Sequence, residues 1–410
     1  MNSTNAMGDK NFLSSTLVLG AGVSAAMHVG KLPPAVPALQ ESLLVTLMQA
    51  GFLLSLVQIG TMLLGLGAGL AAEYIGLRRC MLQGLWLLSA ASICGALVQS
   101  ADMLMLLRAV EGGGMLMATI AGPGLLRRVA PPGQSVRVLG LWSAYMPLGA
   151  AMALLLGPFV INGLGWRGWW WFTALVSAAF AVAVYLQVPV ERASERKRPT
   201  PERRAWIALL QQTLKSKGVW LGSLSFTMYS AQWLAVIGFL PALYAEAGWS
   251  GPMVAVLTAT VAAVNIIGAV VAGLLLQRGL RPDVLLSIGF GAMAVGAWLA
   301  FSDATTGSPI LRYVGALLFS SVGGLIPGNL FALAPQLSPG ERSISTYVGL
   351  LLQFAAVGQV AGPPMVAWLA TEVGGWQWTW VLTCTFCVAG AVLARYIHLW
   401  ISTPAHASQM

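Results

Sequence analysis

Charged residues are scarce in this chain of 410 amino acids. They make up 9% of it, whereas hydrophobic residues make up 57% and the mean hydropathy is +0.77. A soluble globular protein carries roughly 25% charged residues. So little charge excludes a soluble enzyme whose whole surface faces water, and it predicts a membrane protein.

Motifs for catalysis and cofactor binding are missing as well. The sequence contains no G-x-x-x-x-G-K-[ST] loop for nucleotide phosphates and no H-E-x-x-H or G-x-S-x-G motif. Among its four cysteines, Cys384 and Cys387 form a C-x-x-C pair without the second pair or nearby histidine that would complete a metal site. We therefore expect no enzyme activity, no metal ion, no cofactor and no direct use of ATP.

Long apolar segments are abundant instead. Segments of about 20 apolar residues cross a bilayer as α-helices. The sequence predicts twelve of them, at residues 12–36, 44–72, 79–99, 103–126, 136–161, 169–190, 219–245, 253–276, 284–301, 310–336, 344–371 and 378–400. The predicted fold class is therefore an all-α membrane protein with twelve transmembrane helices.

The distribution of basic residues predicts the orientation of these helices. Cytoplasmic loops of membrane proteins are enriched in Lys and Arg. With the N-terminus inside, 18 of the 22 basic residues fall on the cytoplasmic side. The other four are Lys31, Arg108, Arg167 and Arg312. We therefore expect a multi-pass protein of the cell (inner) membrane with both termini in the cytoplasm. An aromatic belt at the outer interface is then formed by Trp166, residues 169–171, Trp376, Trp378 and Trp380.

One long polar connection, at residues 191–218, divides the helices into two sets of six. We predict an N-terminal six-helix bundle over residues 1–190, a basic cytoplasmic linker over 191–218 and a C-terminal six-helix bundle over 219–410. A net charge of +9 would favour a nucleic-acid partner in a soluble chain. Here a linker that helps to set the membrane topology explains the charge, so no nucleic acid is expected.

The two halves repeat features of the sequence. The Gly-Pro pair at 157–158 has a counterpart at 362–363, and GLAAEYIGLRR at 69–79 has a degraded counterpart, GLLLQRGLR, at 273–281. The nearly equal offset of the two pairs indicates duplicated six-helix halves. Transporters built from such repeats bind their solute near the bilayer midplane, where the repeats meet, and alternate access by rocking.

The segment at 69–79 resembles the signature that the major facilitator superfamily carries between its second and third helices. The matching residues are Gly69, Ala71, Ala72, Glu73, Gly76, Arg78 and Arg79. The acid of the signature is usually Asp, and Tyr74 replaces its usual Arg. The R-x-x-x-G-x-G signature of helix 4 is met by Arg108, Gly112 and Gly114. The resemblance covers essentially the whole chain and implies the major facilitator fold, with two six-helix pseudo-repeats.

The same resemblance implies a secondary transporter that works by alternating access, and we expect a monomer. Its cytoplasmic gate would be formed by Gly69, Glu73, Gly76, Arg78 and Arg79, with the acid paired to one of the arginines. The segment GKLPPAVPALQ at residues 30–40 is similar to the branch of cyanate and nitroimidazole permease-like proteins. That branch implies small organic solutes, which are often anionic or polar.

By the resemblance, helices 1, 4, 7 and 10 line a central cavity, and an ionisable group within a span is a functional candidate. The predicted substrate-binding residues are His28, Lys31, Arg108, Tyr229, Gln232, Trp233 and Asn329. Glu111 and His28 are the predicted proton-coupling groups. Each prediction has a plainer alternative: Lys31 extends to the outer interface, Arg108 and Glu111 form a static pair, and the neutral residues make interhelical hydrogen bonds.

The favoured function is proton-coupled uptake of a small organic anion, because two basic groups and one acid leave a positive cavity. The partners are then a small-molecule solute, protons and the lipid bilayer. A drug or metabolite exporter driven by proton antiport stays open, although Ala144 and Ala153 stand where the exporter signature of helix 5 has glycines. A transporter-like membrane sensor is a more distant alternative, which the short tails disfavour.

Overall fold

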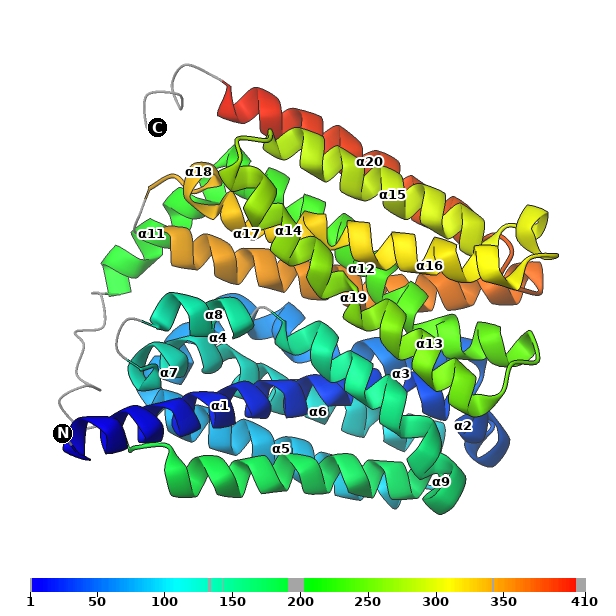
Figure 1. Cartoon of the computed structure of the whole chain (residues 1–410), viewed down its shortest axis with the longest axis horizontal. Coiled ribbons are helices and arrows are strands. Elements are labelled where there is room, and N and C mark those ends of the chain that lie inside the picture. Colours follow the sequence, from blue (N-terminus) through cyan, green and yellow to red (C-terminus); the bar gives the residue numbers. More distant parts are fainter. Residues whose placement is uncertain (1, 132–133, 143, 191–202, 341–342, 403–410) are drawn as a thin grey trace. The chain divides into compact units, whose positions relative to one another are not determined.

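The computed structural model describes residues 2–131, 134–142, 144–190, 203–340 and 343–402 (Figure 1). Side chains are described within these ranges except at 2–10, 69–70, 73, 135–137, 140 and 203–206. The described residues form helices joined by short connections, and none of them lies in a strand. The predicted all-α fold is therefore confirmed.

The chain divides into two compact units. Unit 1 comprises Met1–Arg198 and Gly238–Ala259, and unit 2 comprises Pro199–Ile237 and Thr260–Met410. Residues 191–202, which include much of the predicted linker, lie outside the described part of the chain. The predicted boundaries of the two bundles and the linker stay predictions.

Unit 1 contains the helices of the first half of the chain. They are α1 (Asn2–Gly30), η1 (Pro33–Ala35), α2 (Val36–Leu43), α3 (Leu47–Ser55), η2 (Leu56–Gln58), α4 (Ile59–Ile75), α5 (Leu77–Ala96), α6 (Ala101–Ile120), α7 (Gly122–Val129), α8 (Ser135–Trp142) and α9 (Tyr145–Gln187). Helix α1 packs along α9, and α5 packs against both α6 and α9. The predicted first and fourth helices, which carry the ionisable candidates, correspond to α1 and α6.

Local signals set the helix boundaries around the end of α1. Pro33 and Pro34 cannot donate backbone hydrogen bonds, so α1 ends at Gly30 and the chain continues as the short 3₁₀ turn η1. Helix α3 begins with a capping box: Gln49 N donates to Thr46 Oγ1 at 3.1 Å, and Thr46 N donates to Gln49 Oε1 at 3.0 Å. These signals leave Lys31 in the turn directly after α1.

The second half of the chain forms a further set of helices. They are α11 (Arg203–Lys215), α12 (Lys217–Glu246), α13 (Gly251–Ala263), α14 (Asn265–Gln277), α15 (Pro282–Phe301), η3 (Asp303–Thr305), α16 (Pro309–Gly323), α17 (Leu325–Ala332), α18 (Ala334–Leu337), α19 (Ile344–Val373) and α20 (Thr379–Ile401). Within unit 2, α15 packs against α16 and α20, and α14 packs against α17. Two predicted helices are thus interrupted, at Val264 between α13 and α14 and at Gly324 between α16 and α17.

Ten helices in the described ranges are long and apolar enough to cross a membrane, whereas the sequence predicts twelve. The 43-residue helix α9 covers the fifth and sixth predicted segments together. It is interrupted at Gly165, whose φ of 71° is a left-handed conformation that favours glycine. Helix α5 covers the third predicted segment but is not among the ten. A multi-pass membrane architecture is confirmed, and the count of twelve stays a prediction.

The predicted aromatic belt is wrong for four of its tryptophans, among them Trp376, which is 7% exposed. Trp169 and Trp170 are fully buried and Trp166 is 4% exposed, whereas Trp171 is 47% exposed. Residues three and four positions apart share one face of a helix. Trp166, Trp169 and Trp170 therefore lie on one face of α9, and that face packs inside unit 1 instead of meeting the membrane interface.

Candidate functional site

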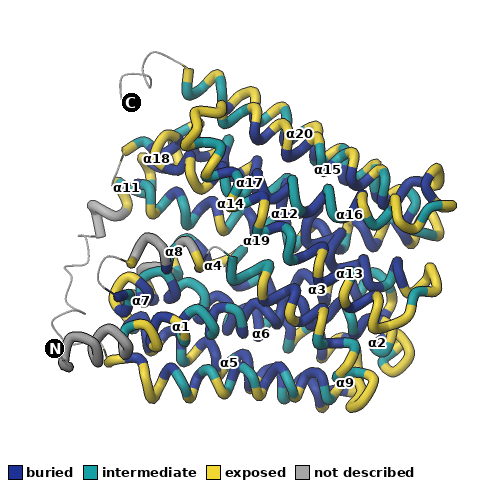
Figure 2. The backbone as a smooth tube through the Cα atoms, viewed as in Figure 1, coloured by how far each residue is buried: buried dark blue, intermediate teal, exposed yellow. Residues whose placement is uncertain are grey.

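The end of α1 carries two buried ionisable side chains. His28 of α1 and Lys31 in the turn after it are both 0% exposed, and residues 24–30 of α1 are buried (Figure 2). Lys31 Nζ lies 3.4 Å from His28 Nδ1, so the two residues share a face as their spacing predicts. The alternative in which Lys31 extends to the outer interface is excluded in this structure.

Helix α6 brings a carboxylate between two cations. Glu111 Oε1 forms an ion pair with Lys31 Nζ, and Glu111 Oε2 forms one with Arg108 Nη1. His28 Nδ1 lies 3.5 Å from the same Oε1 atom. Glu111 is 1% exposed and Arg108 is 0% exposed. The structure therefore joins the four predicted ionisable residues, which we call the charged centre: His28, Lys31, Arg108 and Glu111.

Arg108 connects the charged centre to the backbone of two further segments. Its Nε donates to Leu53 O at 3.0 Å, and its Nη1 donates to His28 O at 2.8 Å. Leu53 lies near the end of α3, just before the chain turns into η2. The Nη2 atom of Arg108 is buried and has no hydrogen-bond acceptor among the described residues. The guanidinium group of Arg108 thus keeps one nitrogen, Nη2, whose N–H groups have no acceptor among the described residues.

Lys31 is held by α5 and α9 in addition to Glu111. Its Nζ donates to Ser92 Oγ at 2.9 Å and lies 4.6 Å from the centre of the Trp170 ring, a cation–π distance. Trp169 Nε1 donates to Lys31 O at 2.8 Å. Ser92 and the two tryptophans were missed by sequence reasoning. The spacing of positions 166, 169 and 170, which puts three tryptophans on one helix face, was the sequence signal that these residues could be buried.

The electrostatics of the charged centre are unbalanced. With His28 neutral, two cations face one carboxylate, which leaves a formal charge of +1 in a buried site. Buried polar groups without partners are costly. Several side-chain nitrogen atoms of unit 1 are buried without a hydrogen-bond partner among the described residues. They include Gln58 Nε2, Arg108 Nη2, Trp166 Nε1 and Trp170 Nε1. The interior of unit 1 therefore has spare positive charge and spare donors.

Unit 2 brings two of its four predicted residues into one uncharged network. Tyr229 Oη donates to Asn265 Oδ1 at 3.1 Å, and Asn265 Nδ2 donates to Ser320 O at 2.8 Å. Trp233 Nε1 donates to Ser320 Oγ at 3.3 Å. Asn265 begins α14 and Ser320 lies one turn before the break at Gly324, so the network joins the two interrupted helices. We call Tyr229, Trp233, Asn265 and Ser320 the neutral centre.

Gln232 and Asn329 do not belong to the neutral centre in this structure. Gln232 Nε2 donates to Met228 O at 3.0 Å, and its Oε1 accepts from Cys387 Sγ of α20 at 3.3 Å. Asn329 Nδ2 donates to Pro282 O at the start of α15, at 2.7 Å. Gln232 neighbours Trp233 in the chain, but successive helical residues point about 100° apart, so the two side chains reach different partners.

The predicted gate is described only in part. The side chain of Glu73 lies outside the described part of the chain, so its predicted pairing with an arginine stays a prediction, as does the role of Gly69. Gly76 separates α4 from α5 with a φ of 98°, which favours glycine. Arg78 Nη2 donates to Tyr185 O at 2.5 Å, and the guanidinium lies 5.3 Å from the Tyr185 ring. Arg79 is exposed.

The degraded repeat at 273–281 carries an ion-pair cluster that sequence reasoning missed. Arg281 Nε and Nη2 donate to the Asp283 carboxylate at 3.1 and 2.8 Å, and Arg281 Nη2 lies 3.0 Å from His398 Nε2 of α20. His398 Nδ1 lies 3.5 Å from Asp283 Oδ1. The closely spaced Arg281 and Asp283 were a local signal, whereas His398 is distant in the sequence. The degraded repeat therefore ends in an arginine that is paired with ionisable residues from outside the repeat.

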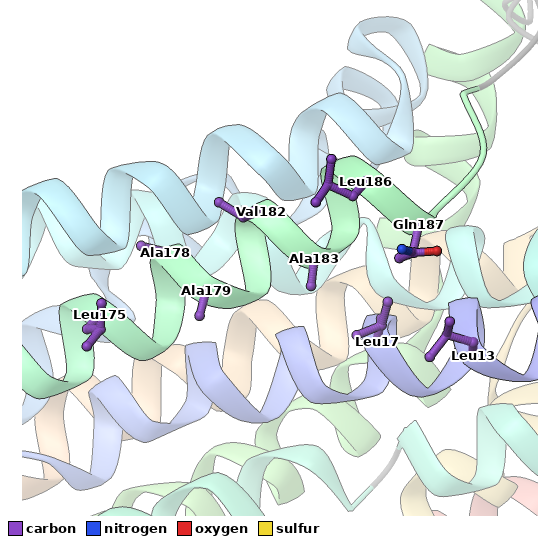
Figure 3. A pocket seen from close by; sticks show the side chains of 9 residues that line it. All are labelled: Leu13, Leu17, Leu175, Ala178, Ala179, Val182, Ala183, Leu186 and Gln187. Atoms are coloured by element: carbon purple, nitrogen blue, oxygen red, sulfur yellow. The ribbon is translucent and has the colours of Figure 1, made fainter.

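An apolar groove lies on unit 1 between α1 and α9 (Figure 3). It has a volume of about 640 Å³ and is lined by Leu13, Leu17, Leu175, Ala178, Ala179, Val182, Ala183, Leu186 and Gln187. No member of the charged centre lines it. In the described ranges, no group of three or more His, Cys, Asp and Glu side chains is placed to hold a metal ion. Four buried ionisable side chains therefore meet in the charged centre and not in the groove.

Several known proteins are similar to this chain. A 2-nitroimidazole transporter of Escherichia coli is 25% identical over 360 residues, which cover 84% of each protein. The methylenomycin A resistance protein of Streptomyces coelicolor is 27% identical over 46% of this chain and 40% of its own length. The drug efflux pump JefA of Mycobacterium tuberculosis is 28% identical over 35% of this chain and 28% of its own length.

Solved structures share the fold at low sequence identity. A D-xylose–proton symporter superposes with a TM-score of 0.73 and 16% identity, over 93% of this chain and 97% of that protein. An inward-facing bacterial homologue of the lysosomal transporter Spinster gives 0.75 and 16%, over 98% of each. The family model of the Major Facilitator Superfamily matches residues 15–343 and 222–409. The predicted resemblance is therefore confirmed, and the chain belongs to the Major Facilitator Superfamily.

Proposed function

We propose that the protein is a secondary active transporter that takes up a small organic anion together with a proton by alternating access. The observation that carries the proposal is the pairing of one buried carboxylate, Glu111, with two buried cations, Lys31 and Arg108. The proposed setting is the inner membrane, with both termini in the cytoplasm and a monomeric protein. The wider predicted site also keeps Gln232 and Asn329 as candidate solute contacts.

The charge of the site favours an anion. Buried charges are tolerated when they are paired, and an isolated one is expensive. The charged centre has one cation in excess, and Arg108 Nη2 is a donor without a partner among the described residues. A monoanion is attracted by this positive charge and can accept a charge-assisted hydrogen bond from that atom.

Competition between the solute and Glu111 would couple the anion to a proton. An anion that binds Lys31 and Arg108 takes over the partners that Glu111 holds in this structure. A buried carboxylate without a neighbouring cation is costly as an ion, so it takes up a proton. When the anion leaves, the cations pair with Glu111 again and its proton is released. Anion and proton therefore travel in the same direction, as in a symporter.

The solute of the E. coli relative fits this chemistry. In 2-nitroimidazole the nitro group withdraws electrons from the ring and makes its N–H acidic, so the conjugate base is a small planar monoanion. Such an anion has a ring nitrogen and nitro oxygens as acceptors for Lys31 and Arg108. We therefore propose a planar monoanion, either a nitroazolate or a carboxylate, as the solute class.

Uptake into proteoliposomes tests the proposed function. Radiolabelled 2-nitroimidazole is added outside at acidic pH, with an alkaline interior, and protein-free liposomes measure leakage through the lipid. We expect accumulation above the protein-free level only while the pH gradient is present. Protein-dependent counterflow without any response to the gradient would refute proton coupling, and the absence of both would refute the solute class.

Export by proton antiport is the second candidate function. The partial similarity to a resistance protein and to an efflux pump favours it. In an antiporter the competition has the opposite sign: a cationic solute would replace Lys31 and Arg108 beside Glu111, and protons would displace the solute. Everted membrane vesicles distinguish the two, because an antiporter accumulates a cationic dye on acidification of the lumen and the proposed symporter does not.

A further inference from the structure

A row of hydroxyl groups continues from the charged centre along α1 and α9. Starting from the proposed anion–proton symport, we infer that His28, Ser177 and Ser24 form the path by which the proton leaves Glu111. His28 is the first acceptor, and the two serines pass the proton on. Ser24 and Ser177, which lie outside the charged centre, are then proton-transfer residues.

The atoms form a continuous sequence of short contacts. His28 Nδ1 lies 3.5 Å from Glu111 Oε1, and His28 Nε2 lies 2.9 Å from Ser177 Oγ. Ser177 Oγ lies 3.2 Å from Ser24 Oγ. His28 and Ser177 are 0% exposed and Ser24 is 1% exposed. The row is therefore sealed from water in this structure, and protons must pass between the side chains themselves.

The hydrogen bonds have a direction. The ammonium group of Lys31 has no acceptor atom, so at the 3.4 Å contact it is the donor and His28 Nδ1 the acceptor. A neutral imidazole then carries its proton on Nε2, which donates to Ser177 Oγ. Ser177 can then donate its own proton to Ser24 Oγ. In this arrangement all donors point away from the charged centre.

This arrangement allows a balanced transfer. Glu111 gives its proton from Oε1 to His28 Nδ1, and His28 gives the proton on Nε2 to Ser177 Oγ. Ser177 gives its own hydroxyl proton to Ser24, and Ser24 gives its own to water in the inward-facing state. His28, Ser177 and Ser24 each gain one proton and lose one, so among the side chains only Glu111 changes charge, and water receives the proton. Rotation of the hydroxyl groups and an exchange of the imidazole proton between its nitrogens restore the starting arrangement.

The surrounding charges favour departure of the proton. Lys31, Glu111 and Arg108 are the charged groups that face His28, and the two cations pair with Glu111 again once the anion has left. A protonated His28 beside two cations is therefore a transient species. Ser24 lies four residues before His28, about 6 Å toward the N-terminus of α1 at 1.5 Å per residue. In the predicted topology that direction leads to the cytoplasm.

A second branch of hydroxyl groups ends in closed hydrogen bonds. Lys31 Nζ donates to Ser92 Oγ, which donates to Trp170 O at 2.9 Å and lies 3.2 Å from Thr173 Oγ1. Thr173 Oγ1 in turn donates to the carbonyl groups of Trp169 and Trp170 at 3.3 and 3.1 Å. Backbone carbonyls cannot pass a proton on. Thr173 is therefore a matched control for Ser177, because it is buried on the same helix, about one turn away.

The test separates net uptake from exchange in proteoliposomes with radiolabelled 2-nitroimidazole. Net uptake driven by an alkaline interior requires release of the proton in every cycle. Counterflow at equal pH does not, because a second anion can bind before Glu111 has lost its proton. We expect Ser177→Ala and Ser24→Ala each to lower net uptake about tenfold or more, with counterflow within about twofold of wild type. Ser177→Thr, which keeps a hydroxyl group, restores net uptake, and Thr173→Val leaves both modes unchanged.

Three results would overturn the path. Net uptake by Ser177→Ala and Ser24→Ala at the wild-type rate would show that the protons go elsewhere. An equal loss of both modes in these variants would assign the serines to helix packing. If wild-type protein catalyses counterflow but shows no gradient-driven uptake, the proposed coupling itself fails and the path fails with it. The last result appears in the wild type, so the two failures are distinguishable.

Discussion

The polar interiors of the two units differ in charge. The centre in unit 1 contains two cations, a carboxylate and an imidazole, whereas the centre in unit 2 is built from a phenol, an indole, an amide and a hydroxyl. Both centres lie at helix interruptions: the neutral one joins the breaks at Val264 and Gly324, and Arg108 contacts α1 and α3 close to their ends. In the proposed mechanism, unit 1 therefore carries the ionic chemistry, and unit 2 contributes uncharged hydrogen bonds.

Removing a cation from unit 1 has the largest expected effect. Arg108→Gln removes both the pairing with Glu111 and the unused donor, and Lys31→Gln leaves the centre without excess charge. We expect either change to weaken binding of benzoate, a planar monoanion, about tenfold to hundredfold. Isothermal titration of purified protein measures the effect, and Arg167→Gln, an arginine outside the charged centre, is the control. Unchanged affinity in both variants would contradict the anion site.

Removing the acid distinguishes binding from coupling. Glu111→Gln leaves two cations without a carboxylate, so we expect lower thermal stability than in Lys31→Gln and a larger stabilisation by benzoate than in wild type. Benzoate still binds, because both cations remain. Accumulation driven by a pH gradient is lost. Thermal unfolding with and without benzoate, with Glu372→Gln as an exposed control, checks the result. Gradient-driven accumulation in Glu111→Gln would rule out Glu111 as the proton carrier.

The neutral centre should respond more weakly. Tyr229→Phe removes one hydrogen bond, from Tyr229 to Asn265, and leaves the ring in place. A neutral hydrogen bond contributes about 0.5–1.5 kcal/mol, so we expect a change in transport rate of about two- to tenfold without a change in pH dependence. Uptake at several pH values measures both quantities. A shift of the pH profile would show that unit 2 takes part in proton transfer, which would contradict the proposed restriction of proton chemistry to unit 1.

The sequence predicted those parts of the site that depend on local spacing. His28 and Lys31 share a face because they are three residues apart, and the same spacing predicted the pair of Arg108 and Glu111. That the two pairs form one cluster depends on how α1 packs against α6, which no local pattern reports. The hydroxyl partners, Ser92 and Ser177, were invisible for the same reason.

The wrong and incomplete predictions have physical causes. Tryptophans are common both in membrane interfaces and in buried cores, so composition alone misplaced Trp169 and Trp170. The helices interrupted at Val264 and Gly324 were predicted as continuous, because apolar sequence does not reveal a break that tertiary hydrogen bonds stabilise. The all-α membrane fold was predictable because about 20 consecutive apolar residues satisfy their backbone groups in lipid only as a helix.

Proton uptake on anion binding measures directly whether anion and proton are coupled in the charged centre. Benzoate is added to solubilised wild-type protein in weakly buffered solution, and a pH indicator follows the protons taken up from the medium. Because the anion replaces Glu111 on both cations, the account predicts uptake of about one proton per bound benzoate, and none in Glu111→Gln. Saturable benzoate binding to wild-type protein without proton uptake would contradict the coupling of anion and proton in the charged centre.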